Sequence, residues 1–140
     1  MGSGSMDDKA LQAWLAVVER DMKAIRNNLY GPEPEPSMAA YHCQQAVEKL
    51  LKTVLVATGV MPPKSHDLDL LIARLPTEHP IAPRARALSH LVVFLSGPRY
   101  PGPGIFNDPP DDPSVEEVVG WLGEIESLRA DILRFLGLPS

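Results

Sequence analysis

Residues 39–67 combine side-chain types that can hold an anion and move a proton. Four follow one another at helical spacing and a fifth comes later: Gln45, Glu48, Lys49, Lys52 and His66. Lysine ammonium groups neutralise phosphate, an amide can read the polar edges of a ligand, and imidazole donates or accepts a proton near neutral pH. The stretch is therefore a candidate site for a phosphate-bearing ligand.

The first four of these polar residues are predicted to share one side of a helix. Apolar residues between Cys43 and Leu55 recur every three or four positions, which is typical of an amphipathic helix with one buried side. At about 100° per residue, the polar set falls on the opposite side, together with Tyr41. A plainer interpretation is that Glu48 and Lys52 form an ordinary surface pair, worth roughly a few tenths of a kcal/mol.

His66 stands at the start of a further predicted helix. The central helix ends at Gly59, and a shorter apolar pattern follows His66 until Pro76 stops it. Either Ser65 or Asp67 can cap this short helix. Backbone N–H groups at a helix start attract anions, so His66 is expected either to contact a ligand there or to serve in capping and packing.

Arg99 and Tyr100 lie near the start of residues 97–113, a segment so rich in proline and glycine that it is predicted to be a long loop. The guanidinium of Arg99 can form forked hydrogen bonds with phosphate, and Tyr100 offers a ring on which a base can stack. The alternative is a surface salt bridge and a packed tyrosine that hold the loop in place.

The rest of the sequence predicts the helices that must position these groups. Helical apolar patterns occupy four further segments, at 7–29, 68–75, 83–96 and 114–136. The prolines of residues 31–36 connect the first two helices and allow antiparallel packing. Asp112 as an N-cap, or a capping box of Ser114 and Glu117, opens the last helix. No strand pattern competes, so the expected fold class is all-α, an up-and-down bundle of four to five helices.

Length and charge fit one domain with a locally basic middle. Residues 1–5 look like a cloning scar, and residues 6–140 are expected to form a single helical domain. The net charge of −5 argues against a general nucleic-acid binder, and DNA is not an expected partner. Residues 37–100 hold seven bases against four acids, and all four histidines. An anionic ligand is therefore expected to meet this segment.

The sequence lacks the motifs of several other classes. It has no Gly-x-x-x-x-Gly-Lys, no His-Glu-x-x-His and no Gly-x-Ser-x-Gly, so no metal site and no cofactor are expected. No apolar run nears the roughly 18 residues of a membrane span, and no signal peptide is seen. The single cysteine, Cys43, fits a cytoplasmic protein and is expected to be a buried apolar residue rather than a nucleophile.

Three motifs resemble those of the HEPN domain family, named for higher eukaryotes and prokaryotes nucleotide-binding. They are Gln44-Gln45-Ala46-Val47-Glu48-Lys49-Leu50-Leu51-Lys52, Pro63-Lys64-Ser65-His66-Asp67-Leu68 and Arg99-Tyr100-Pro101. The first two match the forms Q-Q-A-x-E-K-x-x-K and P-x-[ST]-H-D-L, and the third follows the fourth predicted helix as it commonly does in the family. The resemblance spans nearly the whole chain and implies a helical up-and-down bundle.

The resemblance also implies a nucleotide-binding or partner module. HEPN proteins of the similar branch are often encoded beside a minimal nucleotidyltransferase and are frequently dimers. We therefore expect a homodimer that works with such an enzyme, in a toxin–antitoxin pair, and that takes a nucleotide or RNA as ligand. In this hypothesis the polar side of the central helix faces a cleft that also holds His66, Arg99 and Tyr100.

A metal-independent ribonuclease is the alternative that the resemblance implies. Many HEPN relatives use an Arg-x(4–6)-His pair, in which the arginine holds the phosphate and the histidine acts as general acid and base. Arg84 and His90 fit that spacing. They lie about 120° apart on an ideal helix, however, and Ala85 stands where a polar residue usually follows the arginine. A third hypothesis is a purely structural, dimerising subunit, so whether the chain is an enzyme stays open.

Overall fold

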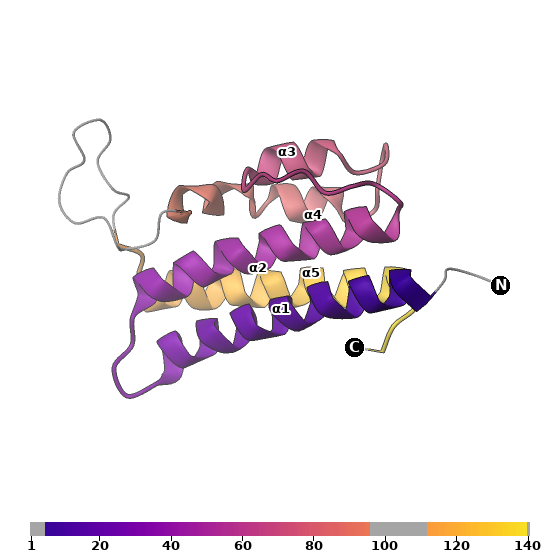
Figure 1. Cartoon of the computed structure of the whole chain (residues 1–140). Helices are drawn as coiled ribbons and strands as arrows, with labels where there is room; N and C mark the ends of the chain where they lie inside the picture. Colours follow the sequence, from indigo (N-terminus) through magenta and orange to yellow (C-terminus); the bar gives the residue numbers. More distant parts are fainter. Residues whose placement is uncertain (1–4, 96–111, 140) are drawn as a thin grey trace.

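Three long helices and three short ones form the part of the chain that is described. The structure is a computed structural model that describes residues 5–95 and 112–139. The elements are α1 (Ser5–Tyr30), α2 (Pro36–Ala57), α3 (Leu68–Ala73), α4 (Ala82–Arg86), the 3-10 helix η1 (Ser89–Phe94) and α5 (Val115–Leu136), as Figure 1 shows. No strand occurs within these residues, and the prediction of an all-α bundle is confirmed.

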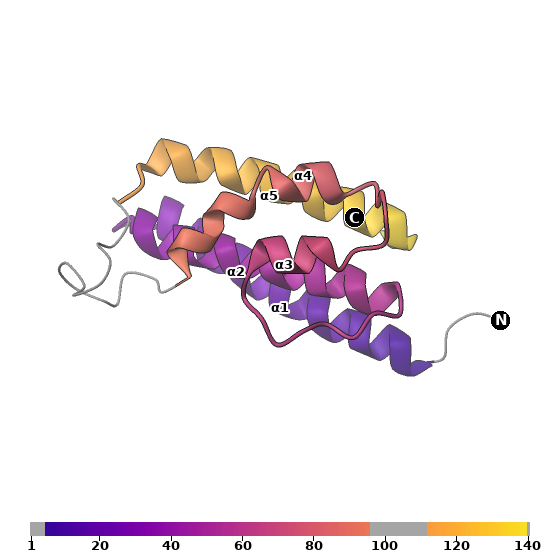
Figure 2. The same ribbon diagram turned by 90° about the horizontal axis from the view of Figure 1, so that it is seen from above.

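The long helices lie side by side, and the short ones complete the bundle. α1 and α2 form an antiparallel hairpin, and α5 lies behind them, parallel to α2 (Figure 1). α3, α4 and η1 carry the chain back along the side of α2 that α1 leaves open, where they contact α2 and α5 (Figure 2). Together these short segments take the place of a fourth long helix.

α2 is the central element because its neighbours cover most of it. Every residue from Leu50 to Leu55 is buried, including Lys52 and Thr53. α1, α5, α3 and η1 each pack on it. The prediction of one buried side and one polar, outward side is therefore wrong for α2, because Glu48 and Lys52 lie inside the protein. The plainer alternative, an ordinary surface pair of Glu48 and Lys52, is also wrong, because the pair is present but buried.

Side-chain caps begin α5 in one of the two ways that the sequence allows. The Ser114 hydroxyl accepts a hydrogen bond from the Glu117 N–H at 3.0 Å, and the Glu117 carboxylate accepts one from the Ser114 N–H at 3.0 Å. This reciprocal capping box satisfies two N–H groups that a helix start leaves unpaired. Asp112 instead accepts a hydrogen bond from the hydroxyl of Ser37 at 2.8 Å, near the start of α2.

The predicted helix over 83–96 is divided into α4 and η1, which corrects the expectation of one continuous helix. Ala85, Leu88 and Leu91 are fully buried and lie three residues apart. A 3-10 helix has three residues per turn, so this spacing keeps such residues on one side. The Leu91 N–H accordingly donates to the Leu88 carbonyl at 3.1 Å, a bond of the 3-10 type.

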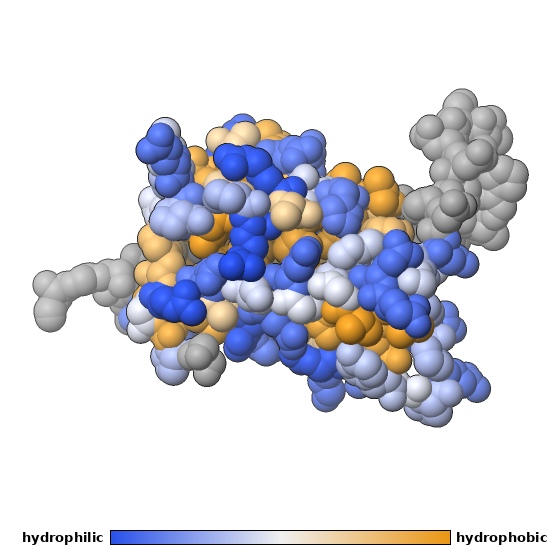
Figure 3. Space-filling model, turned by 180° about the vertical axis from the view of Figure 1, so that it is seen from behind, coloured by the Kyte–Doolittle hydropathy of each residue, from blue (hydrophilic) through white to orange (hydrophobic). Residues whose placement is uncertain are grey.

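Hydrophilic side chains cover much of the surface on the α5 side, and the apolar areas between them are separate (Figure 3). Arg26 of α1 pairs with Glu126 of α5 at 3.1 Å, and Arg129 pairs with Glu19. Exposed pairs of this kind contribute at most about 1 kcal/mol, so the apolar core rather than these contacts holds α1 to α5. Within the described ranges, no helix is long and apolar enough to cross a membrane.

Cys43 and His79 are both buried, and burial changes the chemistry of each. Burial raises the pKa of the Cys43 thiol to about 12, so it stays protonated and packs as an apolar residue, as predicted. The His79 ring packs edge-on against Phe135, with the ring centres 4.5 Å apart. Its Nδ1 accepts a hydrogen bond from the Ile81 N–H at 3.3 Å. Nε2 therefore carries the hydrogen, and no described residue accepts it. Burial lowers the pKa of His79, so the ring is neutral in the folded protein at pH 7.

We expect mild acid to weaken the fold through His79. Because the pKa of His79 is lowered in the folded state from its ordinary 6.5, the unfolded chain binds the proton more readily, and the free energy of unfolding falls as the pH drops below 6.5. His79→Asn removes the titrating ring and keeps an acceptor for the Ile81 N–H. Urea unfolding at pH 7 and pH 5 is expected to show that the free energy of unfolding falls less in this variant than in the wild type. Equal decreases would contradict a role of His79 in the acid sensitivity.

Candidate functional site

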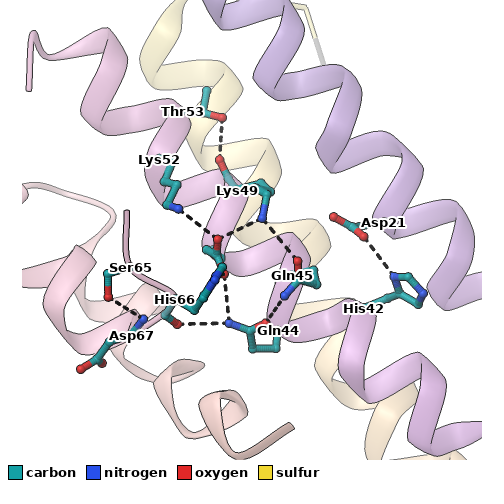
Figure 4. Close-up of polar contacts among 11 residues, drawn as sticks. Asp21, His42, Gln44, Gln45, Lys49, Lys52, Thr53, Ser65, His66 and Asp67 are labelled. Atoms are coloured by element: carbon teal, nitrogen blue, oxygen red, sulfur yellow. Dashed lines mark hydrogen bonds and ion pairs between the residues drawn. The ribbon is translucent and has the colours of Figure 1, made fainter. Parts of the chain in front are cut away.

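A buried carboxylate in the middle of α2 organises the candidate site. Glu48 has no exposed surface. Its Oε2 accepts hydrogen bonds from Lys49 Nζ at 2.9 Å and from Lys52 Nζ at 3.1 Å. Its Oε1 pairs with His66 Nδ1 at 2.9 Å, so the segment before α3 reaches back to α2 (Figure 4). We call the following six residues the Glu48 cluster: Gln44, Gln45, Glu48, Lys49, Lys52 and His66.

Two amides extend the cluster and connect it to the backbone. The Gln44 side chain is fully buried, and its Nε2 donates both to Glu48 Oε1 at 3.3 Å and to the His66 carbonyl at 3.2 Å. Gln45 donates to Gln44 Oε1 at 2.6 Å and accepts from Lys49 Nζ at 3.3 Å. Gln45 thus holds Lys49, and Gln44 holds the segment between α2 and α3 (Figure 4).

Glu48 remains ionised although it is buried. Desolvation by burial raises the pKa of a carboxyl group, but hydrogen bonds from Lys49, His66 and Lys52 stabilise the charged form more strongly. The net effect is that the pKa of Glu48 lies below its usual value. The site therefore contains a full negative charge, with two ammonium groups directed at it.

The charges of the cluster do not balance. Lys49 and Lys52 carry two positive charges against the single negative charge of Glu48, before any proton on His66 is counted. The Lys52 side chain is only 9% exposed and uses one of its three N–H donors on a described residue. A nearly buried positive charge without full compensation is costly, so this position favours an additional anion.

His66 is the most exposed member of the cluster. Its side chain is 59% exposed, whereas that of Lys49 is 18% exposed. The start of α3 itself is not free for an anion, because Asp67 accepts hydrogen bonds from the N–H groups of Asp69 and Leu70 at 3.0 and 3.4 Å. Of the two predicted caps, Asp67 is therefore the one used, and His66 turns toward Glu48.

The structure brings together five of the seven predicted nucleotide-binding residues. Gln45, Glu48, Lys49, Lys52 and His66 form one hydrogen-bonded network. Arg99 and Tyr100 lie outside the described residues. Gln44 was not singled out from the sequence. Its four-residue spacing to Glu48 and then to Lys52 places all three on one side of α2, and that spacing is the signal that could have identified it.

Arg84 and His90 are anchored to different parts of α5. Arg84 Nε pairs with Asp131 Oδ2 at 2.7 Å, and the His90 ring packs against Trp121 with ring centres 5.5 Å apart. Because Asp131 and Trp121 are ten residues apart, their positions on α5 differ by about 15 Å along its axis. The described structure therefore does not bring the two groups of the ribonuclease hypothesis together.

Other histidine and acidic side chains do not form a metal site in the described ranges. His42 Nδ1 contacts Asp21 Oδ1 at 3.0 Å and links α2 to α1, on a different part of α2 from the Glu48 cluster (Figure 4). No group of three or more potential ligands that could hold a metal ion occurs among residues 5–95 and 112–139.

Glu48→Gln tests how far the fold depends on this cluster. Removing the carboxylate charge leaves two ammonium groups without their partner, and breaking a buried pair in this way costs about 3–5 kcal/mol of unfolding free energy. Glu126→Gln is the matched control, because its partner Arg26 and Glu126 itself are both nearly half exposed, and it should cost at most about 1 kcal/mol. Urea unfolding of both variants measures the difference. Similar costs would mean that the cluster does not stabilise the fold as described.

The comparisons with known proteins agree with the sequence motifs and the helical fold. The family model of the HEPN domain matches residues 11–129. Searches of the curated proteins and of the solved structures found no match. The matched range contains α2, the Glu48 cluster and most of α5. It supports a nucleotide-binding or ribonuclease-type module in general. The chain belongs to the HEPN domain family.

Proposed function

We propose that this HEPN domain binds the phosphate groups of a nucleotide at the Glu48 cluster, and that it works as a homodimer with a minimal nucleotidyltransferase in a toxin–antitoxin pair. The observation that carries the binding proposal is the excess positive charge held around a buried carboxylate. Lys49, Lys52 and His66 converge on Glu48, and the cluster lies at the interface of α2 with the segment before α3.

Glu48 serves in this proposal to position the cations. Lysine side chains are flexible, and ordering them around a ligand costs free energy at the moment of binding. Here the hydrogen bonds to Glu48 hold both ammonium groups in place in advance. An anion that meets Lys49 therefore encounters a donor that is already ordered. This arrangement differs from a solvated row of lysines, which would have to be ordered by the ligand.

Gln45 is less suited to reading the polar edges of a base than the sequence suggested. Its Nε2 and Oε1 are both engaged, with Gln44 and Lys49 respectively. Contact with a base would have to replace one of these bonds. The geometry therefore supports a positioning role, in which Gln45 holds the ammonium group of Lys49.

The partner enzyme and the homodimer rest on the resemblance of the motifs to the transferase-associated branch of the family. The ribonuclease alternative has less support, because Arg84 and His90 contact α5 at positions about 15 Å apart along its axis.

Calorimetry with nucleoside mono-, di- and triphosphates tests the binding proposal. The wild type is expected to bind, and Lys49→Met is expected to weaken binding about tenfold or more, since a charge-assisted hydrogen bond is worth about 1.5–3 kcal/mol. Lys23→Met is the matched control, because Lys23 is an exposed lysine of α1 outside the cluster, and it should leave affinity unchanged. If correctly folded wild type binds none of these ligands, the proposed function is wrong.

Co-expression with a minimal nucleotidyltransferase encoded next to the gene tests the partner. We expect the two proteins to co-purify and the HEPN chain alone to show the mass of a dimer by light scattering. A monomer that forms no complex with the transferase would contradict the partner and dimer parts of the proposal without affecting nucleotide binding.

A further inference from the structure

His66 presents its two ring nitrogens to different surroundings. Nδ1 lies 2.9 Å from Glu48 Oε1, and an ionised carboxylate can only accept, so Nδ1 carries a hydrogen. The side chain is 59% exposed, and among the described residues Nε2 has no hydrogen-bond partner. The Gln44 amide donates to the His66 carbonyl at 3.2 Å and so fixes the backbone of His66, while Glu48 orients its ring.

This arrangement makes an anion contact at Nε2 depend on a proton. When the ring is neutral and Nδ1 carries its hydrogen, Nε2 is an acceptor and repels the oxygen of a phosphate. When the ring is protonated, Nε2 is a donor and attracts it. An anion that contacts Nε2 must therefore bind the imidazolium form of His66, whatever else it contacts.

The charges around His66 set the charge of the ligand that fits. From α2 the ring is faced by Glu48, Lys49 and Lys52; on its own segment and at the start of α3 the charged residues are Lys64, Asp67 and Asp69. Asp67 is engaged in capping α3. No ion pair joins His66 to α1, α4, η1 or α5 within the described ranges. Taken alone, the six residues of the Glu48 cluster have one excess positive charge with a neutral ring and two with a protonated ring; Lys64, Asp67 and Asp69 are all exposed to solvent, which screens their charges.

We infer that the Glu48 cluster takes a terminal phosphate, a phosphomonoester dianion, and takes up one proton at His66 Nε2 as it binds. This inference rests on the proposed nucleotide binding and names the chemical group bound. The two charges of the dianion match the two excess charges of the protonated cluster. An internal phosphodiester has one charge, which the two lysines already balance against Glu48, so its binding needs no proton.

Calorimetry at pH 7.0 and pH 8.5 tests this inference with three ligands: AMP, the dinucleotide ApA, which has only an internal phosphodiester, and ApA with a 5′-phosphate. The second ionisation of a phosphomonoester lies near pH 6, so the ligand stays a dianion throughout and any change comes from the protein. We expect the two monoesters to bind more tightly than ApA. Their affinity should fall toward tenfold per pH unit at the alkaline end, as one-proton uptake requires.

His66→Asn is the decisive variant. Asparagine can still donate to Glu48 but has no group at the position of Nε2, and the exposed site tolerates the change in volume. The variant is expected to bind AMP with an affinity that does not change with pH and with no preference over ApA. Lys23→Met should keep both the pH dependence and the preference. Thermal melts at each pH establish that the variants are folded.

The outcomes separate the two proposals. If no ligand binds to the wild type, the proposed function itself fails. If ApA binds as tightly as AMP, with no proton uptake, the nucleotide-binding proposal stands and the terminal-phosphate inference is overturned. Tighter binding of AMP supports a free nucleotide as the source of the phosphate, and tighter binding of 5′-phosphorylated ApA supports an RNA end; both support the inference.

Discussion

The carboxylate of Glu48 is buried in the centre of α2 and stays ionised because Lys49, Lys52 and His66 all donate to it. Desolvation opposes this charge, and only the combined hydrogen bonds overcome it. The same bonds reach beyond α2, since His66 belongs to the segment that leads into α3. Gln44 strengthens that connection by donating to the His66 backbone. One ion pair network thus joins the central helix to the segment that covers it.

The irregular connection between α2 and α3 supplies the polar partners of this network. A continuous helix packed along α2 would present side chains at helical spacing and would keep its own carbonyl groups in internal hydrogen bonds. The connecting segment before α3 instead offers a free backbone carbonyl to Gln44 and a histidine ring to Glu48. The irregular part of the bundle therefore supplies the polar partners that a buried acid requires.

Local sequence signals predicted the helices and their caps well, but they could not predict which sides of α2 are covered. Apolar periodicity identified the long helices, and the capping groups at Asp67 and Ser114 were among those expected. The burial of Glu48 and Lys52 could not be read from the sequence, because periodicity gives the angle of a residue about a helix and not the number of neighbouring helices. The division of residues 83–96 was missed for a related reason, since a three-residue repeat fits both an amphipathic α-helix and a 3-10 helix over two turns.

The two halves of the Glu48 cluster belong to elements of different length. Glu48 and both lysines lie on α2, which has 22 residues, whereas His66 precedes α3, which has 6. Short elements with few buried contacts open by local unfolding at lower free energy than long, central helices. A ligand held between these halves would slow amide hydrogen exchange chiefly in the α2–α3 segment, where part of its binding free energy is spent on conformational order. Ligand binding would thus change the dynamics of the α2–α3 segment and leave the three long helices unmoved.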